Sequence, residues 1–353
     1  MHHYLVTTYN SERYVTEMLD SIIRQYPSIA AFQREARILV VDDCSTDDTR
    51  AVLVNLAHAY PNLHVHFNDR NQGIGRNRND LLDWAYGDVE GHVPAAPSDF
   101  VLFVDGDDVL TPTHMADKLA EFARDPMVDV VGGQLELFYE DGGARHVVDT
   151  FSTDPDVLAI ANLFECHIYI SNALFRGSVF RSPGVRFPET PTSEDWLFFA
   201  QHHLRVRHVP AVTLQYRRHS ANVTLWAASG QVTELRHTAH RLAALHMGQH
   251  LSTRECELVD LVGYLSFRSR WVGNRFVAAD AHMPWFAYLS RRPGITAAWP
   301  ALRLELVDLF ERMRAHNWRA TGYSMSKLDG FLSAILARAD EEVSSTGALA
   351  PAA

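Results

Sequence analysis

Hydrophobic and polar positions in the first half of the chain follow two alternating patterns. Short apolar runs at residues 4–8, 37–41 and 100–104 indicate buried strands, which are apolar on both faces in a parallel sheet. Between these runs, apolar residues recur every three or four positions, as at residues 14–23, and that spacing predicts helices. Strands that alternate with helices are typical of an α/β domain with a mostly parallel sheet.

The same patterns place the remaining elements of the first half. We predict further helices at residues 46–58, 77–84 and 115–122, and further strands at residues 64–67 and 128–139. The pattern then changes after about residue 224, beyond which no strand run is visible.

Four long helical patterns fill the last third of the chain, at residues 229–250, 253–281, 295–316 and 326–342. The sequence therefore predicts three parts. They are an α/β domain of residues 1–224, a helical C-terminal domain of residues 225–343, and a disordered tail over residues 344–353.

Polar and acidic side chains stand at the ends of three predicted strands. Thr7 and Tyr9 close the first strand, Asp42 and Asp43 end the second, and residues 105–108, Asp-Gly-Asp-Asp, follow the third. Ligands of open α/β sheets bind beyond the carboxyl ends of the strands, so we expect these residues to gather at one site. Carboxylates there could hold a hard divalent cation on a substrate phosphate. The alternative for each acidic run is a polar turn with helix-capping aspartates.

Two further motifs stand later in the chain. Glu194-Asp195-Trp196 opens an apolar helix, where a carboxylate either caps the helix or serves as a general base. Tyr216-Arg217-Arg218-His219 follows an apolar strand and could grip a diphosphate or bind a metal. A solvated basic edge is the alternative for the second motif.

Composition and charge narrow the class of protein. The chain has 353 residues, 47% of them hydrophobic, which excludes a disordered protein. Residues 1–224 carry 18 basic and 31 acidic side chains, so general nucleic-acid binding, which needs a basic surface, is not expected. Only Lys118 and Lys327 are lysines among the 32 basic residues.

Cysteine spacing and hydropathy point to a cytoplasmic protein. The three cysteines lie far apart, and form neither a zinc-binding spacing nor a disulfide framework. No apolar run approaches the ~18 residues that a membrane-spanning helix needs, and no secretory signal is visible. The first strand–helix turn contains no glycine, which argues against a dinucleotide-binding dehydrogenase.

Taken in order, these motifs resemble those of the family 2 glycosyltransferases, which have the GT-A nucleotide-sugar fold. The resemblance covers Tyr4 to about Thr224. It rests on Val6-Thr7-Thr8-Tyr9-Asn10, the run at residues 41–49, Arg78-Asn79, the D-x-D-like run at residues 105–108, Glu194-Asp195-Trp196 and Tyr216-Arg217-Arg218-His219.

The resemblance implies roles for individual residues. The implied donor-binding residues are Thr7, Tyr9, Asp42, Asp43, Arg78, Asp107, Arg217 and Arg218. The implied ligands of a Mn²⁺ or Mg²⁺ ion are Asp108, Asp107 and His219. Asp195 is implied as the catalytic base, with Glu194 beside it in the catalytic motif.

Two positions depart from the family pattern. Cys44 replaces the usual glycine after the paired aspartates, and a cysteine would be strained there if the backbone needs a positive φ. Arg76 adds a charge where the family usually has a small residue, a difference that could reflect a particular donor or acceptor.

The implied reaction is a single, inverting displacement of a nucleoside diphosphate by an acceptor hydroxyl. A UDP-sugar is the favoured donor, because Asp43 can accept the N3–H of uracil, although thymine and guanine offer comparable donors. The acceptor is a saccharide or a glycolipid. Two alternatives stay open: a non-catalytic nucleotide-sugar-binding or assembly protein on the same fold, and a nucleotidyltransferase, whose lysine-bearing glycine loop is absent here.

The C-terminal helices carry one further feature. Arg268, Arg270 and Arg275 lie near Trp271 and Phe276, a set that could touch anionic lipid headgroups at the inner face of a membrane. A packed helix with a solvated arginine face, or a contact within a homo-oligomer, is the simpler interpretation.

Overall fold

A computed structural model describes most of the chain. The described residues are 1–87, 94–140, 142–143, 145–148, 152–219, 229–267, 295–315 and 325–347. They form two compact units, of which the first comprises residues 1–153, 168–198 and 204–219, and the second residues 154–167, 199–203 and 220–353. The division falls near the predicted boundary at residue 224, but two short earlier stretches belong to the second unit.

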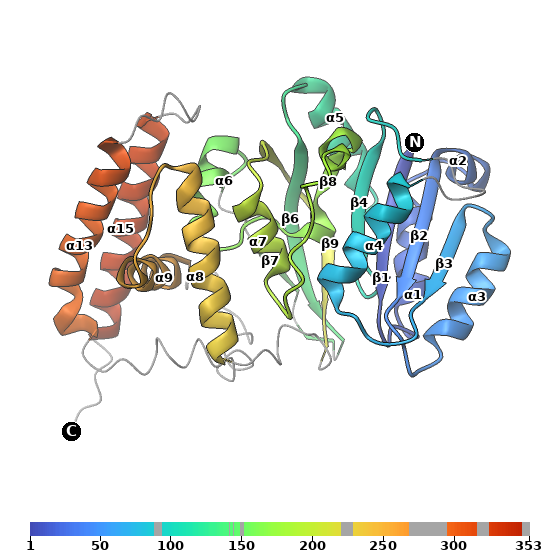
Figure 1. Cartoon of the computed structure of the whole chain (residues 1–353), viewed down its shortest axis with the longest axis horizontal. Coiled ribbons are helices and arrows are strands. Elements are labelled where there is room, and N and C mark those ends of the chain that lie inside the picture. Colours follow the sequence, from blue (N-terminus) through green and yellow to red (C-terminus); the bar gives the residue numbers. More distant parts are fainter. Residues whose placement is uncertain are drawn as a thin grey trace. The chain divides into compact units, whose positions relative to one another are not determined.

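Half of the sheet in the first unit is parallel. It consists of β1 (His2–Thr8), β2 (Ala36–Asp42), β3 (Leu63–Phe67) and β4 (Phe100–Asp105). These strands lie side by side in the order β3-β2-β1-β4 (Figure 1), and all three pairings are parallel. They correspond to the strands predicted at residues 4–8, 37–41, 64–67 and 100–104.

The other half of the sheet is mixed. It contains β5 (Val109–Leu110), β6 (Val130–Tyr139), β7 (His146–Val148), β8 (Leu174–Arg176) and β9 (Val206–Arg218). β6 pairs with β9 in parallel, whereas the β4–β8, β6–β8, β6–β7 and β5–β9 pairings are antiparallel. The long pairings of the sheet are all parallel, as the sequence predicts, and the antiparallel pairings involve only two or three residues each. The short strands β5, β7 and β8 that make them are too short to show a period in the sequence.

Helices cover the sheet of the first unit. They are α1 (Val15–Ile23), α2 (Ile29–Glu35), α3 (Thr49–Ala59), α4 (Ile74–Tyr86), α5 (His114–Arg124) and α7 (Glu194–Gln201), with 3₁₀ turns η1 (Ile170–Asn172) and η2 (Gly177–Arg181). Helix α4 packs on β1 and β2, whose Leu5, Val6 and Leu39 are buried. The unpredicted helix α2 begins after Ser28, whose side chain accepts a hydrogen bond from the Ala31 N–H.

The described part of the second unit is helical, as predicted. Its helices are α6 (Pro155–Ala161), α8 (Ser229–His246), α9 (Thr253–Phe267), α13 (Ile295–Ala315) and α15 (Met325–Gly347). Helices α13 and α15 pack side by side (Figure 1). Ion pairs join neighbouring helices, as between Arg254 of α9 and Glu305 of α13.

Two predictions for the second unit concern residues that lie partly or wholly outside the described part of the chain. Helix α15 runs to Gly347, so the first residues of the predicted tail are helical, and residues 348–353 lie outside the description. The aromatic and basic set at residues 268–276 also lies outside it. No helix among the described residues is long and apolar enough to cross a membrane.

Candidate active site

The parallel register brings the predicted strand-end residues together. Thr7 of β1 stands beside Asp105 of β4, and its hydroxyl donates a hydrogen bond to Asp105 Oδ1 at 3.1 Å. Thr8 stands beside Asp42 of β2, and its hydroxyl donates to Asp42 Oδ1 at 3.1 Å. Three strand ends therefore meet at one edge of the sheet.

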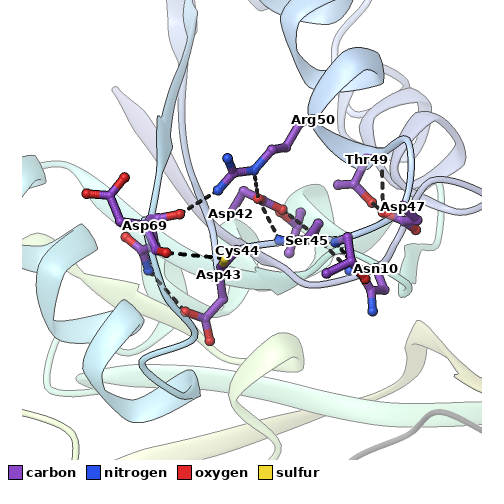
Figure 2. A network of polar contacts seen from close by, with 12 residues as sticks. Asn10, Asp42, Asp43, Cys44, Ser45, Asp47, Thr49, Arg50 and Asp69 are labelled. Carbon is purple, nitrogen blue, oxygen red and sulfur yellow. Dashed lines mark hydrogen bonds and ion pairs between the residues drawn. The ribbon is translucent and has the colours of Figure 1, made fainter.

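The Asp42 carboxylate is fully occupied within the protein. It has no exposed surface, and it accepts hydrogen bonds from the Ser45 N–H at 3.1 Å, the Arg50 Nε–H at 3.1 Å, and the hydroxyls of Ser45 and Thr8. Figure 2 shows Arg50 and Ser45 pointing at Asp42 from the loop and helix that follow β2. Asp42 thus holds the loop that ends in α3.

A reciprocal interlock joins the turn after β1 to the loop after β2. Asn10 has a φ of 50°, and its side-chain oxygen accepts a hydrogen bond from the Thr46 N–H at 2.8 Å. The Glu12 carboxylate accepts from the Asp48 N–H at 2.8 Å, and the Asp47 carboxylate accepts from the Glu12 N–H at 3.2 Å. These bonds fix the two loops relative to each other.

Asp43 holds a third loop in place. Its Oδ1 accepts hydrogen bonds from the Gln72 N–H at 2.7 Å and the Asn68 side chain at 3.1 Å, and its Oδ2 accepts from the Gly73 N–H at 3.0 Å. Asn68 is a site residue that the sequence did not reveal, because a lone asparagine after a short strand carries no distinctive pattern. The orientation of the Asp43 carboxylate is therefore already fixed by the loop before α4, without any ligand.

Cys44 occupies the backbone conformation that the family pattern suggests. Its φ is 64°, in the left-handed region where a side chain is strained. The thiol donates a hydrogen bond to the Asp69 carbonyl oxygen at 3.5 Å, as Figure 2 shows. A glycine would adopt this φ without a steric penalty.

Arg78 is a buried cation between two carboxylates. Its Nη1 donates to Glu194 Oε1 at 2.6 Å, and its Nη2 donates to Asp105 Oδ1 at 3.1 Å. Burial opposes its charge, but the charges of Asp105 and Glu194 outweigh this and raise the pKa of Arg78. Arg78 therefore joins the D-x-D-like run to the helix that carries Asp195, rather than presenting a free guanidinium.

Asp195 is the half-buried carboxyl at the start of α7. Its Oδ1 accepts a hydrogen bond from the Trp196 N–H at 2.7 Å. Burial and then the charge of Glu194 raise its pKa to about 7, against the opposing effect of Arg78. A base is most effective when its pKa lies near the working pH, so Asp195 is suited to accept a proton near neutrality.

Asp108 is the buried last residue of the acidic run. Its Oδ1 accepts a hydrogen bond from the Arg217 N–H at 3.2 Å, whereas its Oδ2 has no hydrogen-bond partner among the described residues. Burial and the charges of Asp107 and Asp105 hold its pKa well above the usual range, and the Ser171 hydroxyl opposes this rise. Asp105 likewise has a raised pKa, through burial and Asp107, despite Arg78.

Two of the predicted metal ligands, Asp107 and His219, lie close together, but the predicted ligands do not form a complete coordination site. His219 Nε2 lies 2.8 Å from Asp107 Oδ2. Among the described residues, no group of three or more His, Cys, Asp or Glu side chains is arranged to hold a metal ion. The donor set nevertheless fits Mn²⁺ or Mg²⁺ chemically, because the partnerless Asp108 Oδ2 and the Asp107 carboxylate are hard oxygen donors.

Arg217 is engaged inside the protein. Its Nε donates to the Asp107 carbonyl oxygen at 2.9 Å and its Nη2 to Glu17 Oε2 at 2.5 Å. Its guanidinium also lies over the rings of Tyr14 and Phe138, at 4.8 and 4.5 Å from their centroids. Arg217 thus anchors the acidic loop, and no sequence signal reveals its partner Glu17, which lies 200 positions away.

The other expected donor residues differ in exposure. Thr7 is buried, whereas Tyr9 is 49% exposed at the mouth of the first turn. Arg218 is half-buried, with its guanidinium 5.1 Å from the centroid of the Tyr216 ring. Tyr9 is the residue of this group that a planar base could reach most readily.

A sheet whose parallel strands end in aspartates, with carboxylates gathered at one edge, is the arrangement of GT-A transferases. Residues 4–186 match the family described as Glycosyl transferase family 2, and the chain belongs to that family. The predicted fold class is confirmed, and the prediction of a glycosyltransferase is confirmed at the level of the family.

The chain is similar to curated proteins over part of its length. It is 29% identical over 212 residues to the poly(ribitol-phosphate) β-N-acetylglucosaminyltransferase TarS of Staphylococcus aureus, covering 59% of this chain and 33% of TarS. It is 26% identical over 210 residues to the poly(ribitol-phosphate) β-glucosyltransferase of Bacillus spizizenii, covering 58% and 30%. The chain thus matches about a third of the length of these relatives.

Solved structures share the fold. The crystal structure of S. aureus TarS 1–349 in complex with UDP-GlcNAc superposes with a TM-score of 0.54 at 23% identity, covering 97% of this chain and 89% of that one. A mannosyltransferase from Pyrobaculum calidifontis, solved with GDP-Man and Mn²⁺, gives a TM-score of 0.51 at 18% identity, covering 96% and 86%.

Proposed function

We propose that this chain is a divalent-cation-dependent, inverting glycosyltransferase that moves a sugar from a nucleoside-diphosphate donor to an acceptor hydroxyl. The observation that carries the proposal is Asp195, a half-buried carboxyl with a pKa of about 7 whose neighbour Glu194 is joined by Arg78 to Asp105 of the acidic run. A base is thereby coupled to the residues suited to a diphosphate.

The chemical step is a single displacement. The acceptor oxygen forms a bond to the anomeric carbon while the bond from that carbon to the diphosphate oxygen breaks, with the bonding electrons going to the diphosphate. Asp195 takes the proton of the acceptor hydroxyl, a role that is typically worth about 10²–10⁴-fold in rate. Burial and then the Glu194 charge raise the pKa of Asp195, and Arg78 holds Glu194 in place.

The cation belongs with Asp108, Asp107 and His219. When bound, it would act as a Lewis acid that stabilises negative charge on the departing diphosphate. The buried Asp108 Oδ2, which lacks a partner among the described residues, supports this assignment, because a buried polar oxygen without a partner is costly.

A UDP-sugar is the donor that we favour, and a glycan or polyol-phosphate chain is the acceptor. The neighbouring TarS structure contains UDP-GlcNAc, and two curated relatives act on poly(ribitol-phosphate). Asp43 supports a pyrimidine, because its carboxylate can accept the uracil N3–H in addition to the three hydrogen bonds that orient it.

A donor panel tests the proposal. UDP-, GDP-, TDP- and CDP-sugars are incubated with the protein and Mn²⁺, and the released nucleotide and the thermal stabilisation are measured. We expect release of UDP from one UDP-sugar, and none without a divalent cation. Release of pyrophosphate would instead indicate a nucleotidyltransferase, and binding of a donor without turnover on any acceptor would indicate a non-catalytic binding protein.

A further inference from the structure

A buried lysine on α5 takes no part in the proposed chemistry. The Lys118 side chain has no exposed surface, and its Nζ lies 2.7 Å from the Asn172 carbonyl oxygen, 2.9 Å from Asn172 Oδ1 and 2.8 Å from His114 Nε2. All of these partners are uncharged acceptors. Burial holds the pKa of Lys118 well below its usual range. A buried amine is costly, so a local reason for its presence is expected.

The histidine in this cluster is held in one tautomer. His114 Nδ1 lies 2.7 Å from the Thr213 carbonyl oxygen, which can only accept a hydrogen bond, so Nδ1 carries the proton. Nε2 then accepts from Lys118. Burial and the nearby Lys118 hold the pKa of His114 well below its usual range, in accord with a neutral ring. Each polar group of the cluster therefore has a defined donor or acceptor role.

Asn172 connects the lysine to an irregularity in the sheet. The β6–β9 register shifts at Gly133 and Gln134, and the Asn172 side-chain amide donates to the carbonyl oxygens of these two residues at 2.7 and 3.1 Å. Asn172 Oδ1 also accepts from the Thr213 hydroxyl at 2.7 Å. A β-bulge interrupts ladder hydrogen bonds, and here a side chain supplies what the ladder lacks.

The bulge leaves no room for a side chain at Gly133. A Cβ atom on Gly133 would stand 2.3 Å from the Thr213 hydroxyl oxygen. The bulge and the Lys118–Asn172–Thr213 cluster are therefore built as one unit, and bulges commonly redirect a strand next to an active site.

Two elements that the cluster holds, β9 and η1, each carry a residue that contacts Asp108. Beyond the bulge, β9 continues to Arg217, whose N–H donates to Asp108 Oδ1 and whose side chain holds the Asp107 carbonyl. On η1, Ser171 immediately precedes Asn172, and its hydroxyl interacts with Asp108. Asp108 is thus held from two sides by segments that the cluster fixes.

We propose that Lys118, Asn172 and Thr213 form a positioning cluster that sets the course of β9 and η1, and thereby places the Asp108 carboxylate for a cation-bound diphosphate. The proposal rests on the proposed function, since it assigns the diphosphate end of that same site. It predicts that loss of one buried hydrogen bond in the cluster weakens binding of the diphosphate but not of the base.

Thr213 offers a matched pair of variants to test this. Thr213→Val keeps the shape of the side chain and removes the hydroxyl that Asn172 accepts from, whereas Thr213→Ser keeps the hydroxyl. Calorimetry measures binding of UDP with Mn²⁺ and of uridine alone, or of GDP and guanosine if the donor panel selects guanine. Lys118→Met, with Lys327→Met as the control at the other lysine of the chain, repeats the comparison by removing the amine.

We expect Thr213→Val to weaken UDP·Mn²⁺ binding about tenfold, equivalent to about 1.4 kcal/mol, and to leave uridine binding unchanged. Thr213→Ser should match the wild type. The proposal is overturned if Thr213→Val binds UDP·Mn²⁺ as tightly as the wild type, or if it weakens UDP·Mn²⁺ and uridine equally, which would be a general loosening. If the wild type binds none of the diphosphates, the proposed function itself fails, and that outcome is distinct from both.

Discussion

Two clusters of carboxylates, one in each unit, have opposite electrostatics. In the first unit, Asp105, Asp108 and Asp195 all have raised pKa values, and Arg78 is the cation that faces two of them. In the second unit, Arg236 donates to Asp260 at 2.5 Å and to both oxygens of Glu165, at 3.1 and 3.2 Å.

The second cluster is balanced. His240 Nε2 lies 3.3 Å from Asp260, and its Nδ1 lies 2.6 Å from the Leu163 carbonyl oxygen. Although burial alone would raise it, the pKa of Asp260 is lowered by the charge of Arg236 and by His240. This cluster is complete as it stands and ties α8 and α9 to the segment after α6.

The difference separates carboxylates that a bound cation or proton would stabilise from carboxylates that are already paired. A cluster with surplus negative charge is held at an energetic cost to the fold, which a bound cation or an accepted proton would relieve. A balanced cluster gains nothing from either. The backbone follows the same division, because the non-glycine residues with positive φ that the structure describes are Asn10, Cys44 and Ser193, all at or beside the candidate site.

The largest expected effect is on transfer. Asp195→Asn removes the base, so we expect the rate at saturating donor to fall about 10²–10⁴-fold while donor binding persists. The same change removes a carboxyl that its neighbour Glu194 repels, so the melting temperature should not fall. Initial rates and thermal melts measure both, with Asp83→Asn, an exposed carboxyl paired to Arg186, as the control. Full activity of Asp195→Asn would remove this residue from the mechanism.

The balanced cluster should respond in stability instead. Arg236→Met leaves Asp260 and Glu165 without their cation, so we expect the free energy of unfolding to fall by about 3–5 kcal/mol. Arg254→Met is the matched control, because Arg254 is half-exposed and its pairs with Glu305 and Glu257 lie at the surface; a change of about 1 kcal/mol or less is expected. Equal losses from the two variants in urea titrations would contradict the distinction between the clusters.

The two clusters should also differ in their response to pH. Asp195 must be deprotonated to act, so kcat/KM should rise with pH up to about 7, and Glu194→Gln should move the midpoint to lower pH, since the Glu194 charge raises this pKa. Because the pKa of Asp195 is raised on folding, its ionisation destabilises the fold as pH rises from about 4 towards 7. A pH-rate midpoint unchanged in Glu194→Gln would contradict the assignment.

The Asp260 contribution has the opposite sign. Its pKa is lowered on folding, so its stabilisation is present above its unfolded pKa of about 4 and is lost as pH falls below that value. Urea titrations across pH 3–8 of the wild type, Asp195→Asn and Asp260→Asn separate the two contributions. Identical pH profiles for the two variants would show that the clusters do not differ.

The sequence predicted the strand ends better than the roles of the side chains there. Long apolar runs marked β1, β2 and β4, and their register alone brings Thr7, Asp42 and Asp105 to one edge. The occupied carboxylate of Asp42 could not be foreseen, because its partners are set by loop conformation.

Long-range contacts explain the other differences. Arg217 is paired with Glu17 on α1, a contact that no local pattern reveals because the two positions lie so far apart in the sequence. Lys118 stood out only as one of two lysines, and its burial depends on how η1 packs against α5. The raised pKa of Asp195 likewise arises from burial, which a motif does not encode.

Strain at Cys44 gives the smallest expected effect and tests whether the division extends to the backbone. Cys44→Gly removes the side chain from a residue with a φ of 64°, and we expect it to raise the free energy of unfolding by up to about 1 kcal/mol. Cys44→Ala keeps the Cβ and removes the thiol bond to Asp69, so it isolates the φ effect from the loss of that bond. If the glycine variant is more stable than the alanine variant in urea titrations, the nucleotide-side loop holds strain that the sequence retains at a measurable cost. If the two variants have the same free energy of unfolding, the positive φ of residue 44 carries no measurable strain. The difference between the two clusters then lies in their electrostatics alone and not in the backbone.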